Sequence, residues 1–390
     1  MYRTLRLLLL CLPLAATAAE ALRIGVSGPF TGGSAPMGIS MRNGIRLAAA
    51  EINRSGGIRG RPLLLIERDD MGRSDIGIRI ARELTLHQRV IASVGFVNSG
   101  VALASQGHYQ QAGIPAITAV ATAPKVTEQF APPKYPLNYV FRVAASDAQQ
   151  APLIVREAKR SGLSRLAIFH DKTNYGRIGE EELIKALRQQ GLSPVYIGQF
   201  RLGERDMIAQ LSRARDLGAQ AILTYAIGPE LAQIANSLAQ MDWRPQLIGS
   251  WTLSMSNFID DAGPNAEGAR MVQTFISDST DPLRQDFVAR YLQTFGGRRI
   301  PSAVSAAQGY DSLLLLAAAL RHSTSTDGKA IVRALENLPA PVKGVITTYR
   351  QPFSASDHDA IDLAVPVIGK LQHGEVVHAY SNERTQKRRP

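Results

Sequence analysis

Short apolar runs alternate with helix-length segments through the first third of this chain. Runs of strand length occur at Leu22–Ser27, Leu63–Ile66, Ile91–Phe96 and Ile114–Val120. Segments of helical length and polarity lie between them, at Pro36–Ser55, Asp75–Gln88 and Val101–Gln111. This alternation of strand and helix predicts an α/β fold with a doubly wound parallel sheet.

A proline-rich break at residues 131–136 interrupts the alternation, which resumes at Leu166 and continues to Gly249. Two such sheets in series, each too small for a closed barrel, predict two lobes of similar build. No helix signal bridges them, so we expect the linkers to act as a hinge. Strands are also expected at Val345–Tyr349, Leu363–Gly369 and Glu375–Tyr380, completing the two lobes without forming a third sheet.

Hydroxyl residues follow two neighbouring predicted strands. Ser99 comes after the strand Ile91–Phe96, and Thr122 comes after Ile114–Val120. The carboxyl ends of parallel strands face the ligand crevice, and Ser99 also lies where a helix N-terminus leaves N–H groups free. Hydroxyls and N–H groups without a base or a metal ligand predict a holder for a carboxylate. Alternatively, Ser99 only caps its helix and Thr122 only turns its loop.

The first 19 residues have the features of a cleavable export signal. Arg3 and Arg6 precede the apolar run Leu7–Leu14, and small residues follow. The run is shorter than the roughly 20 residues that span a bilayer. Cys11 is the only cysteine, and Leu10 stands before it where a lipoprotein signal has a small residue. We therefore expect an exported protein that is neither lipidated nor disulfide-bonded.

Several functional classes are not predicted. The net charge of +11 falls to +9 without Arg3 and Arg6, and basic residues alternate with acids, apart from a basic tail at residues 381–390 that we expect to be disordered. This pattern predicts no nucleic-acid partner. His108 and His170 have no second ligand at a suitable spacing, so we predict no metal and no cofactor. The chain lacks G-x-G-x-x-G and G-x-S-x-G at the expected places, and no nucleophile–base pair is recognisable, so we predict no enzyme.

Seven segments, in order from about Leu22 to Tyr380, match motifs of one protein family. They are IGVSGPFTGGSAPMGISMRNGIRLAAAEINRSGGIRGRPLLLIERDD, GFVNSG, AVATAPKVTE, VFRVAASDAQQ, HDKTNYGRIG, AGPNAEG and AQGYDSLLL. Together they resemble the solute-binding proteins of branched-chain amino acid (leucine/isoleucine/valine) ABC transporters. The resemblance implies the type I periplasmic-binding-protein fold, in which two doubly wound parallel-sheet lobes are joined by three crossovers.

The resemblance also implies where these lobes begin and end. The crossovers fall near Val143, Met271 and Gly344. Lobe 1 then comprises residues 20–143 and 272–344, and lobe 2 comprises residues 144–271 and 345–380. The ligand of such proteins is buried in the cleft, and the lobes close over it.

Ligand contacts carry over from the family at five positions. Ser99 matches the serine that binds the ligand carboxylate. Val120, Ala121 and Thr122 match a segment whose carbonyl and threonine reach the ligand amine, and whose N–H and hydroxyl groups reach the carboxylate. Tyr175 matches a tyrosine that lobe 2 contributes to the cleft wall.

Other positions depart from the family pattern. Asn98 replaces a cysteine, so the family's short disulfide is missing, and Ile227 with Gly228 replaces a pair of tyrosines. Trp251 stands where the family has the glutamate that neutralises the amine, and no nearby acid obviously replaces it. Phe30, in the first glycine-rich loop, is an open case because it could line the cleft or could equally staple its helix.

The missing glutamate bears on the ligand. An ammonium closed into a dry cleft without its acid costs about 1.5–3 kcal/mol or more, against the ~8 kcal/mol of micromolar binding. Trp251 instead offers an apolar face for stacking, although ordinary packing between lobes is the alternative. We expect a small carboxylate ligand, either a branched-chain or hydrophobic amino acid, or an amine-free acid with an aromatic or otherwise apolar body.

The expected function is therefore transport. The resemblance implies a periplasmic solute-binding protein of an ABC importer, which delivers its ligand to a membrane permease, and we expect it to be a monomer. The alternative is a ligand-sensing protein that signals through a membrane partner, because both roles use the same closure.

Overall fold

Two large β-sheets dominate the computed structural model, which describes residues 20–277 and 281–381. The first sheet is entirely parallel, in the order β2-β1-β3-β4-β5. Its strands are β1 (Leu22–Gly28), β2 (Leu63–Asp69), β3 (Ala92–Gly95), β4 (Ala116–Thr118) and β5 (Val140–Arg142). The signal segment lies outside the described residues, as does the basic tail apart from Ser381.

The second sheet has the order β14-β13-β10-β9-β8-β6-β7. Its parallel strands are β6 (Leu166–Asp171), β7 (Tyr196–Phe200), β8 (Ala221–Tyr225), β9 (Gln246–Gly249) and β10 (Arg270–Gln273). β13 (Val367–Gln372) and β14 (Glu375–His378) add to one edge in the antiparallel sense. The α/β fold with parallel sheets expected from the sequence is confirmed.

Helices cover both sheets. The first sheet carries α1 (Ala35–Arg54), α2 (Ser74–Leu86), α3 (Ser99–Ala112) and α4 (Lys125–Glu128). The second carries α5 (Asp147–Arg160), α6 (Asn174–Gln189), α7 (Ile208–Asp216), α8 (Gly228–Gln240) and α9 (Ser256–Ala262), with the short helices η1 (Trp251–Ser254) and η2 (Gly263–Ala266). The chain then returns to the first sheet with α10 (Pro282–Phe295), α11 (Ala303–His322) and α12 (Gly328–Glu336). α10 and α11 pack on α1, and α12 packs on α11.

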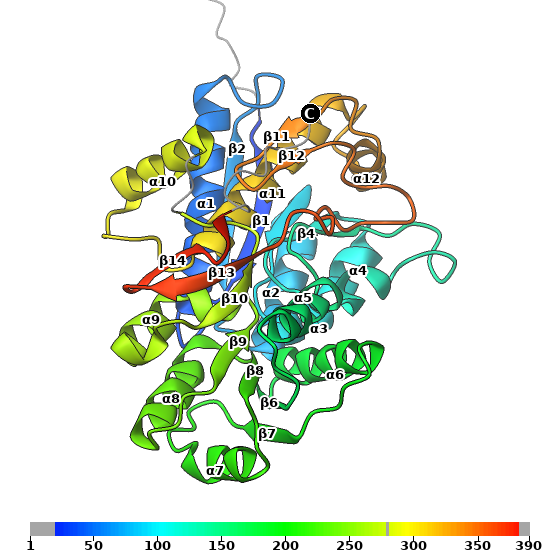
Figure 1. The fold of residues 1–390 in the computed structure, drawn as a ribbon. Coiled ribbons are helices and arrows are strands. Elements are labelled where there is room, and N and C mark those ends of the chain that lie inside the picture. The colour runs from blue at the N-terminus through cyan, green and yellow to red at the C-terminus, as the bar shows by residue number, and fades with distance from the viewer. Residues whose placement is uncertain (1–19, 278–280, 382–390) are drawn as a thin grey trace, which may run out of the picture.

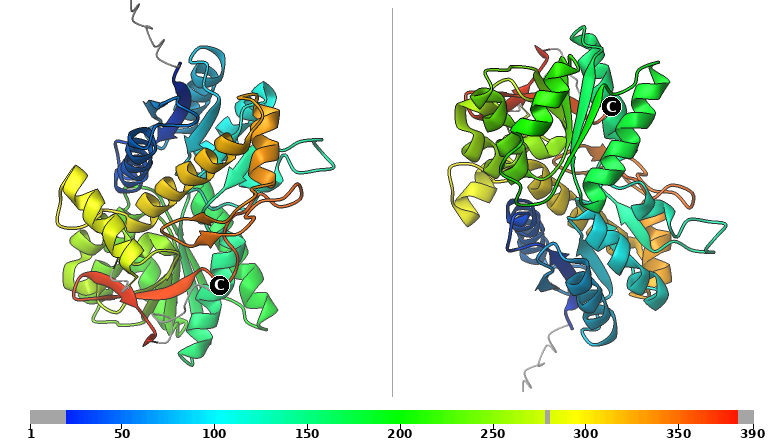
Figure 2. Two further views of the ribbon diagram at one scale, coloured as in Figure 1. Left: turned by 90° about the horizontal axis from the view of Figure 1, so that it is seen from above. Right: turned by 90° about the horizontal axis from the view of Figure 1, so that it is seen from below.

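The elements form two bodies, which we call the first group and the second group after the sheet that each contains. In Figure 1 the blue and cyan elements of the first group lie above the green elements of the second. The two groups stay apart in both views of Figure 2, where the red strands β13 and β14 lie beside the green ones. Segments from both ends of the chain thus complete each group.

One expectation for the C-terminal third was wrong, because a third sheet exists. β11 (Val342–Lys343) and β12 (Thr348–Tyr349) pair in the antiparallel sense as a small two-stranded sheet. The strand expected over residues 345–349 covers only its last two. The N–H groups of Val345 and Ile346 donate instead to the buried carboxylate of Asp311 on α11, at 2.7 and 2.9 Å, so they are not free for a strand ladder.

The register of the first sheet brings its strand ends to one edge. Ser27, Gly95, Thr118 and Arg142 occupy one row across β1, β3, β4 and β5. A Cβ on Gly95 would lie 2.2 Å from the carbonyl oxygen of Ser27, so the row needs glycine at this place. The loops that follow β3 and β4 therefore leave the sheet side by side.

The core of the first group depends on the close approach of α1 and α11. A Cβ on Gly44 would lie 2.0 Å from the carbonyl oxygen of Ala306, and one on Gly309 would lie 2.3 Å from that of Met41. α11 is also long and apolar enough to cross a membrane, but 83% of its most apolar window is buried inside the protein. Burial of this extent is typical of a core helix in a folded domain.

We predict that Gly44→Ala destabilises the protein. The added methyl group must push the two helices apart, which costs about 1–3 kcal/mol and exceeds the gain of up to ~1 kcal/mol in helix propensity. Denaturant unfolding should therefore show a lower midpoint. Gly107→Ala in α3 is the matched control, because its Cβ would meet its first neighbour only at 4.0 Å. That variant should be neutral or more stable, and an equal loss in both would contradict the packing argument.

Candidate functional site

A cavity lies between the two groups at the carboxyl ends of their strands. It has about 270 Å³ of open space, a figure that includes its mouth. The first group contributes Met37, Val97, Asn98, Ser99, Val120 and Thr122, and the second contributes Tyr175, Ile227, Trp251 and Thr252. Residues from six separate segments thus converge on one space.

Six of the eight residues predicted from the sequence line this cavity: Ser99, Val120, Thr122, Tyr175, Ile227 and Trp251. The other two lie elsewhere among the described residues. Ala121 is buried in the core behind the cavity wall, and the ring of Phe30 lies 4.6 Å from the guanidinium of Arg42. Two of the lining residues that the sequence did not single out lie close to predicted ones: Val97 is two residues before Ser99, and Thr252 directly follows Trp251. No feature of the sequence pointed to Met37.

The hydroxyl of Ser99 is free to meet a ligand. The structure places Asn98 at the N-cap of α3 and Ser99 at its first helical position, so the reading of Ser99 as the cap was wrong. The Ser99 Oγ is buried and has no hydrogen-bond partner in the described part of the chain. A buried hydroxyl without a hydrogen-bond partner costs free energy, so we infer that a bound ligand supplies the partner of this hydroxyl.

The loop after β4, residues 119–124, is held in place from behind, and we call it the Thr122 loop. The carbonyl oxygen of Phe96 accepts from the N–H groups of Val120 and Ala121 at 3.3 and 3.0 Å. Phe96 itself has φ +64, an uncommon conformation for a bulky residue, which the surrounding structure must enforce. The carbonyl oxygen of Thr122 accepts from the N–H of Asp147 at 2.8 Å. The Thr122 side chain is therefore fixed by the backbone around it.

The second group faces this loop with a chain of hydroxyls. The Tyr175 Oη lies 2.5 Å from the Ser250 Oγ, which lies 2.9 Å from the Thr252 Oγ1. Behind them the buried Asp171 accepts from the N–H groups of Thr173 and Ile227, and so joins the start of α6 to the end of β8. Burial raises the pKa of the Asp171 carboxyl above its usual range. Tyr175 and Ile227 are thus set at fixed places on the cavity wall.

Trp251 contributes a large apolar surface and one unused donor. Its side chain is buried at the start of η1, and its Nε1–H has no partner among the residues described. The indole N–H can only donate, so an acceptor in the cavity would complete it.

Asp147 is the functional candidate that the sequence analysis missed. It is the first residue of α5 and is fully buried. Neither of its carboxylate oxygens forms a hydrogen bond of normal distance and angle with the described residues. Burial raises the pKa of this carboxyl to about 7, although the hydroxyl of Thr122 and the guanidinium of Arg142 act in the opposite direction. Burial, and after it the charge of Asp147, raises the pKa of Tyr175 on the cavity wall.

None of the residues that line the cavity is an acid. Asp147, at the start of α5 and close to the Thr122 hydroxyl, is a candidate for the place of the missing glutamate. Its only signal in the sequence was a polar residue at a helix start, which is an ordinary feature. Within the described residues, no group of three or more His, Cys, Asp or Glu side chains could hold a metal ion.

Comparison with known proteins identifies the family of this chain. A model of the family described as periplasmic binding protein matches residues 21–364. The chain belongs to this family. The family consists of solute-binding proteins, and its name implies an exported, periplasmic protein.

Individual relatives agree with this assignment. The binding protein is 25% identical over 335 residues to Leu/Ile/Val-binding protein homolog 3 of Brucella melitensis, covering 85% of this chain and 88% of the relative. A periplasmic binding protein type 1 from Bordetella pertussis has a TM-score of 0.82 at 24% identity and covers 92% and 99% of the two chains. A substrate-binding protein of an ABC transporter from Desulfitobacterium hafniense, solved with Leu, has a TM-score of 0.74 at 26% identity and the same coverage. The expected type I fold is confirmed.

We predict that Asp147→Asn makes the ligand-free binding protein more stable at pH 8. Burial raises the pKa from 3.8 to about 7, so the unfolded chain loses this proton first and ionisation favours unfolding as the pH rises between these values. Asparagine cannot ionise, so the variant should gain stability at pH 8, on the order of a few kcal/mol at most, and the difference should vanish towards pH 4.

Denaturant unfolding at pH 5 and pH 8 measures this difference. Asp75→Asn is the control of opposite sign, because a hydrogen bond from Arg73 holds the pKa of the Asp75 carboxyl below its usual range. If the stability of the wild type and of Asp147→Asn depended on pH in the same way, burial would not raise the pKa of the Asp147 carboxyl.

Proposed function

We propose that this protein is the solute-binding component of an ABC importer and that it captures a small carboxylate ligand between two closing lobes. One observation carries the proposal: buried polar groups without partners surround one small cavity at the strand ends. These groups are the Ser99 hydroxyl, the Asn98 side-chain oxygen and the Trp251 N–H. The oxygens of Asp147 also lack a partner in the described residues, but this residue lies outside the cavity lining, near Thr122. Buried polar atoms are normally satisfied, so a cluster of exceptions favours a missing ligand.

The carboxylate end of the ligand meets the first group. The Ser99 hydroxyl, at the N-terminal end of α3, and the Thr122 hydroxyl are the donors that face the cavity. A helix N-terminus attracts an anion, and hydrogen bonds to a charged group contribute about 1.5–3 kcal/mol each.

A cationic group of the ligand lies on the side of the cavity formed by Thr122 and Tyr175, the lining residues nearest to Asp147. An ammonium at this place lowers the cost of burying the carboxylate, although Asp147 itself does not line the cavity. The position of Asp147 therefore favours a hydrophobic α-amino acid over the amine-free acid that Trp251 alone suggested. The body of the ligand lies against Met37, Val97, Ile227 and Trp251, whose apolar surfaces line the remaining wall. The Leu complex of the relative from Desulfitobacterium hafniense supports this choice.

The remaining parts of the proposal concern the chain as a whole. Residues 1–19 direct export and are removed, and the mature monomer delivers its ligand to a membrane permease. Lobe 1 comprises residues 20–143 and 272–344, and lobe 2 comprises residues 144–271 and 345–380. β1–β5 fall in the first range and β13 and β14 in the last, which supports the division at those places. Residues 345–360 instead contact the first group, through Asp311 and Arg142, so the last crossover lies between Ala360 and Val367 and not near Gly344. Thermal-shift screening of residues 20–390 against amino acids and amine-free acids tests the ligand class, because a bound ligand raises apparent stability.

We predict that Ser99→Ala and Thr122→Ala each weaken ligand binding about tenfold or more, because each removes a hydrogen bond to a carboxylate. Isothermal titration calorimetry with L-leucine, and with any stronger ligand from the screen, measures the change. Thr294→Ala is the matched control, since this hydroxyl is exposed on α10 and bonds only within its helix. Wild-type affinity in both site variants would mean that the pocket is misplaced.

We also predict that an amino acid releases protons when it binds at pH 7. An ammonium beside Asp147 lowers the pKa of about 7, so up to about half a proton leaves per ligand bound. An amine-free analogue, 4-methylpentanoate, should instead cause proton uptake, because its carboxylate disfavours the charged form of Asp147. Calorimetry in two buffers of different ionisation enthalpy measures both, and Asp147→Asn should abolish the proton exchange. Uptake with an amino acid would contradict the assigned role.

A further inference from the structure

Arg142 is a buried cation at the end of β5 that no ligand contact accounts for. Its side chain is 1% exposed. Its guanidinium donates hydrogen bonds both to the Thr122 loop and to Asp359. One nitrogen donates to the carbonyl oxygens of Thr122 and Ala123, at 3.2 and 2.7 Å. The others donate to the carboxylate of Asp359, one of them at 2.9 Å. Arg142 thus connects the Thr122 loop to a segment more than two hundred residues later in the chain.

Asp359 lies where the chain passes from the first sheet to the second. β12 ends at Tyr349, and β13 of the second sheet begins at Val367. Between them, residues 358–360 lie along β5: the Arg142 N–H donates to the carbonyl oxygen of His358, and the Ala360 N–H donates to that of Arg142, both at 2.9 Å. The connecting segment is therefore docked on the edge of the first sheet.

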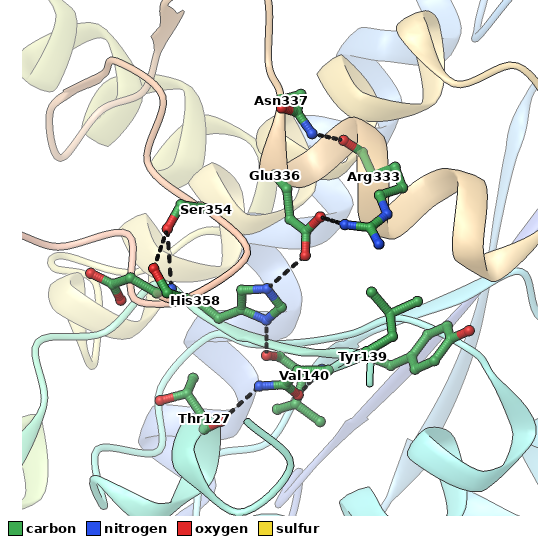
Figure 3. Close-up of polar contacts among 12 residues, drawn as sticks. Thr127, Tyr139, Val140, Arg333, Glu336, Asn337, Ser354 and His358 are labelled. Carbon is green, nitrogen blue, oxygen red and sulfur yellow. Dashed lines mark hydrogen bonds and ion pairs between the residues drawn. The ribbon is translucent and has the colours of Figure 1, made fainter. Parts of the chain in front are cut away.

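His358 fixes the same segment from the other side (Figure 3). Its ring stacks on Phe141 with the centroids 3.9 Å apart. Its Nδ1 lies 2.8 Å from the carbonyl oxygen of Val140. A carbonyl oxygen can only accept, so Nδ1 is the donor. The Nε2 lies 3.4 Å from the carboxylate of Glu336, which also accepts from Arg333 at 2.9 Å. The backbone around Asp359 consequently has little freedom to move.

We propose that Arg142 and Asp359 are positioning residues for the ligand: Asp359 holds the guanidinium of Arg142, and Arg142 holds the Thr122 loop in its binding geometry. The two carbonyl oxygens to which Arg142 donates have a second donor each. That of Thr122 accepts from the N–H of Asp147 at 2.8 Å, and that of Ala123 accepts from the N–H of Val126 at 3.0 Å. Arg142 therefore sets the place of Thr122 and of Asp147 together. The connection between the two sheets thereby becomes part of the binding site without touching the ligand.

Amide hydrogen exchange on the ligand-free mature protein, residues 20–390, tests this arrangement directly. Asp359→Asn keeps the shape of the side chain but removes the charge and one acceptor. We expect the amides of Asp147 and Val126 to exchange about tenfold faster or more than in wild type, because their acceptor carbonyls lose the fixed guanidinium. The Lys172 amide of the second group, which donates to the carbonyl oxygen of Phe200 at 2.9 Å, should exchange as in wild type. Arg142→Lys should act in the same way.

Glu51→Gln is the matched control. Glu51 lies in the last turn of α1, pairs with Arg290 and accepts from the Tyr310 hydroxyl at 2.6 Å. Its side chain is 25% exposed, as is that of Asp359. It should lower stability without changing exchange at the two amides. Unchanged exchange at Asp147 and Val126 in Asp359→Asn, or an equal increase in Glu51→Gln, would overturn the inference.

The effect on affinity rests on the proposed function and is measured separately with L-leucine as the probe. Asp359→Asn should weaken binding about tenfold, and the loss should be much smaller in a Thr122→Ala background, because coupled residues are not additive. Additive losses would overturn the route through Thr122. If wild type fails to bind leucine, the ligand assignment fails, whereas the exchange measurement still decides the positioning role.

Discussion

In-register pairing of β1, β3, β4 and β5 is the constraint on which the binding site depends. The row from Ser27 to Arg142 ends these strands together, so two short loops emerge next to each other with their hydroxyls on one side. The ladder supplies this alignment through backbone hydrogen bonds alone, whatever the side chains in the loops. Side chains such as Ser99 and Thr122 can therefore specialise for a ligand without carrying the fold.

The same edge concentrates groups that weaken the ligand-free protein. The Ser99 hydroxyl is buried with no partner in the described residues, the buried Asp147 carboxylate has only the Thr122 hydroxyl and the more distant charge of Arg142 to offset its burial, and Phe96 holds an unfavourable backbone conformation. Each of these features costs free energy, and the packed core around α11 offsets them. A site left incomplete in this way is most stable when occupied, which couples ligand capture to the stability of the whole protein.

The sequence was informative where local order decides position. The residues after a strand must lie at its carboxyl end, so Ser99 and Thr122 could be brought to one crevice from the alternation of strands and helices. Tyr175, Ile227 and Trp251 came from the family resemblance, and the structure brings all three to the same cavity. Asp147 could not be recognised, because its importance arises from the folding of Thr122 and Tyr175 over an ordinary helix start. The pairing of Asp311 with residues 345 and 346 was hidden for the same reason. Contacts between distant segments leave no periodic trace in the sequence.

The tight contact between Gly44 and Ala306 has a consequence for how the chain acquires its structure during synthesis. The helix that α1 packs against is made about 260 residues after α1 itself. At ~5–20 residues per second, α1 waits on the order of 13–50 s on the ribosome for its neighbour. Throughout that interval the apolar face of α1 is open to wrong partners, and the second sheet can assemble before the first is closed.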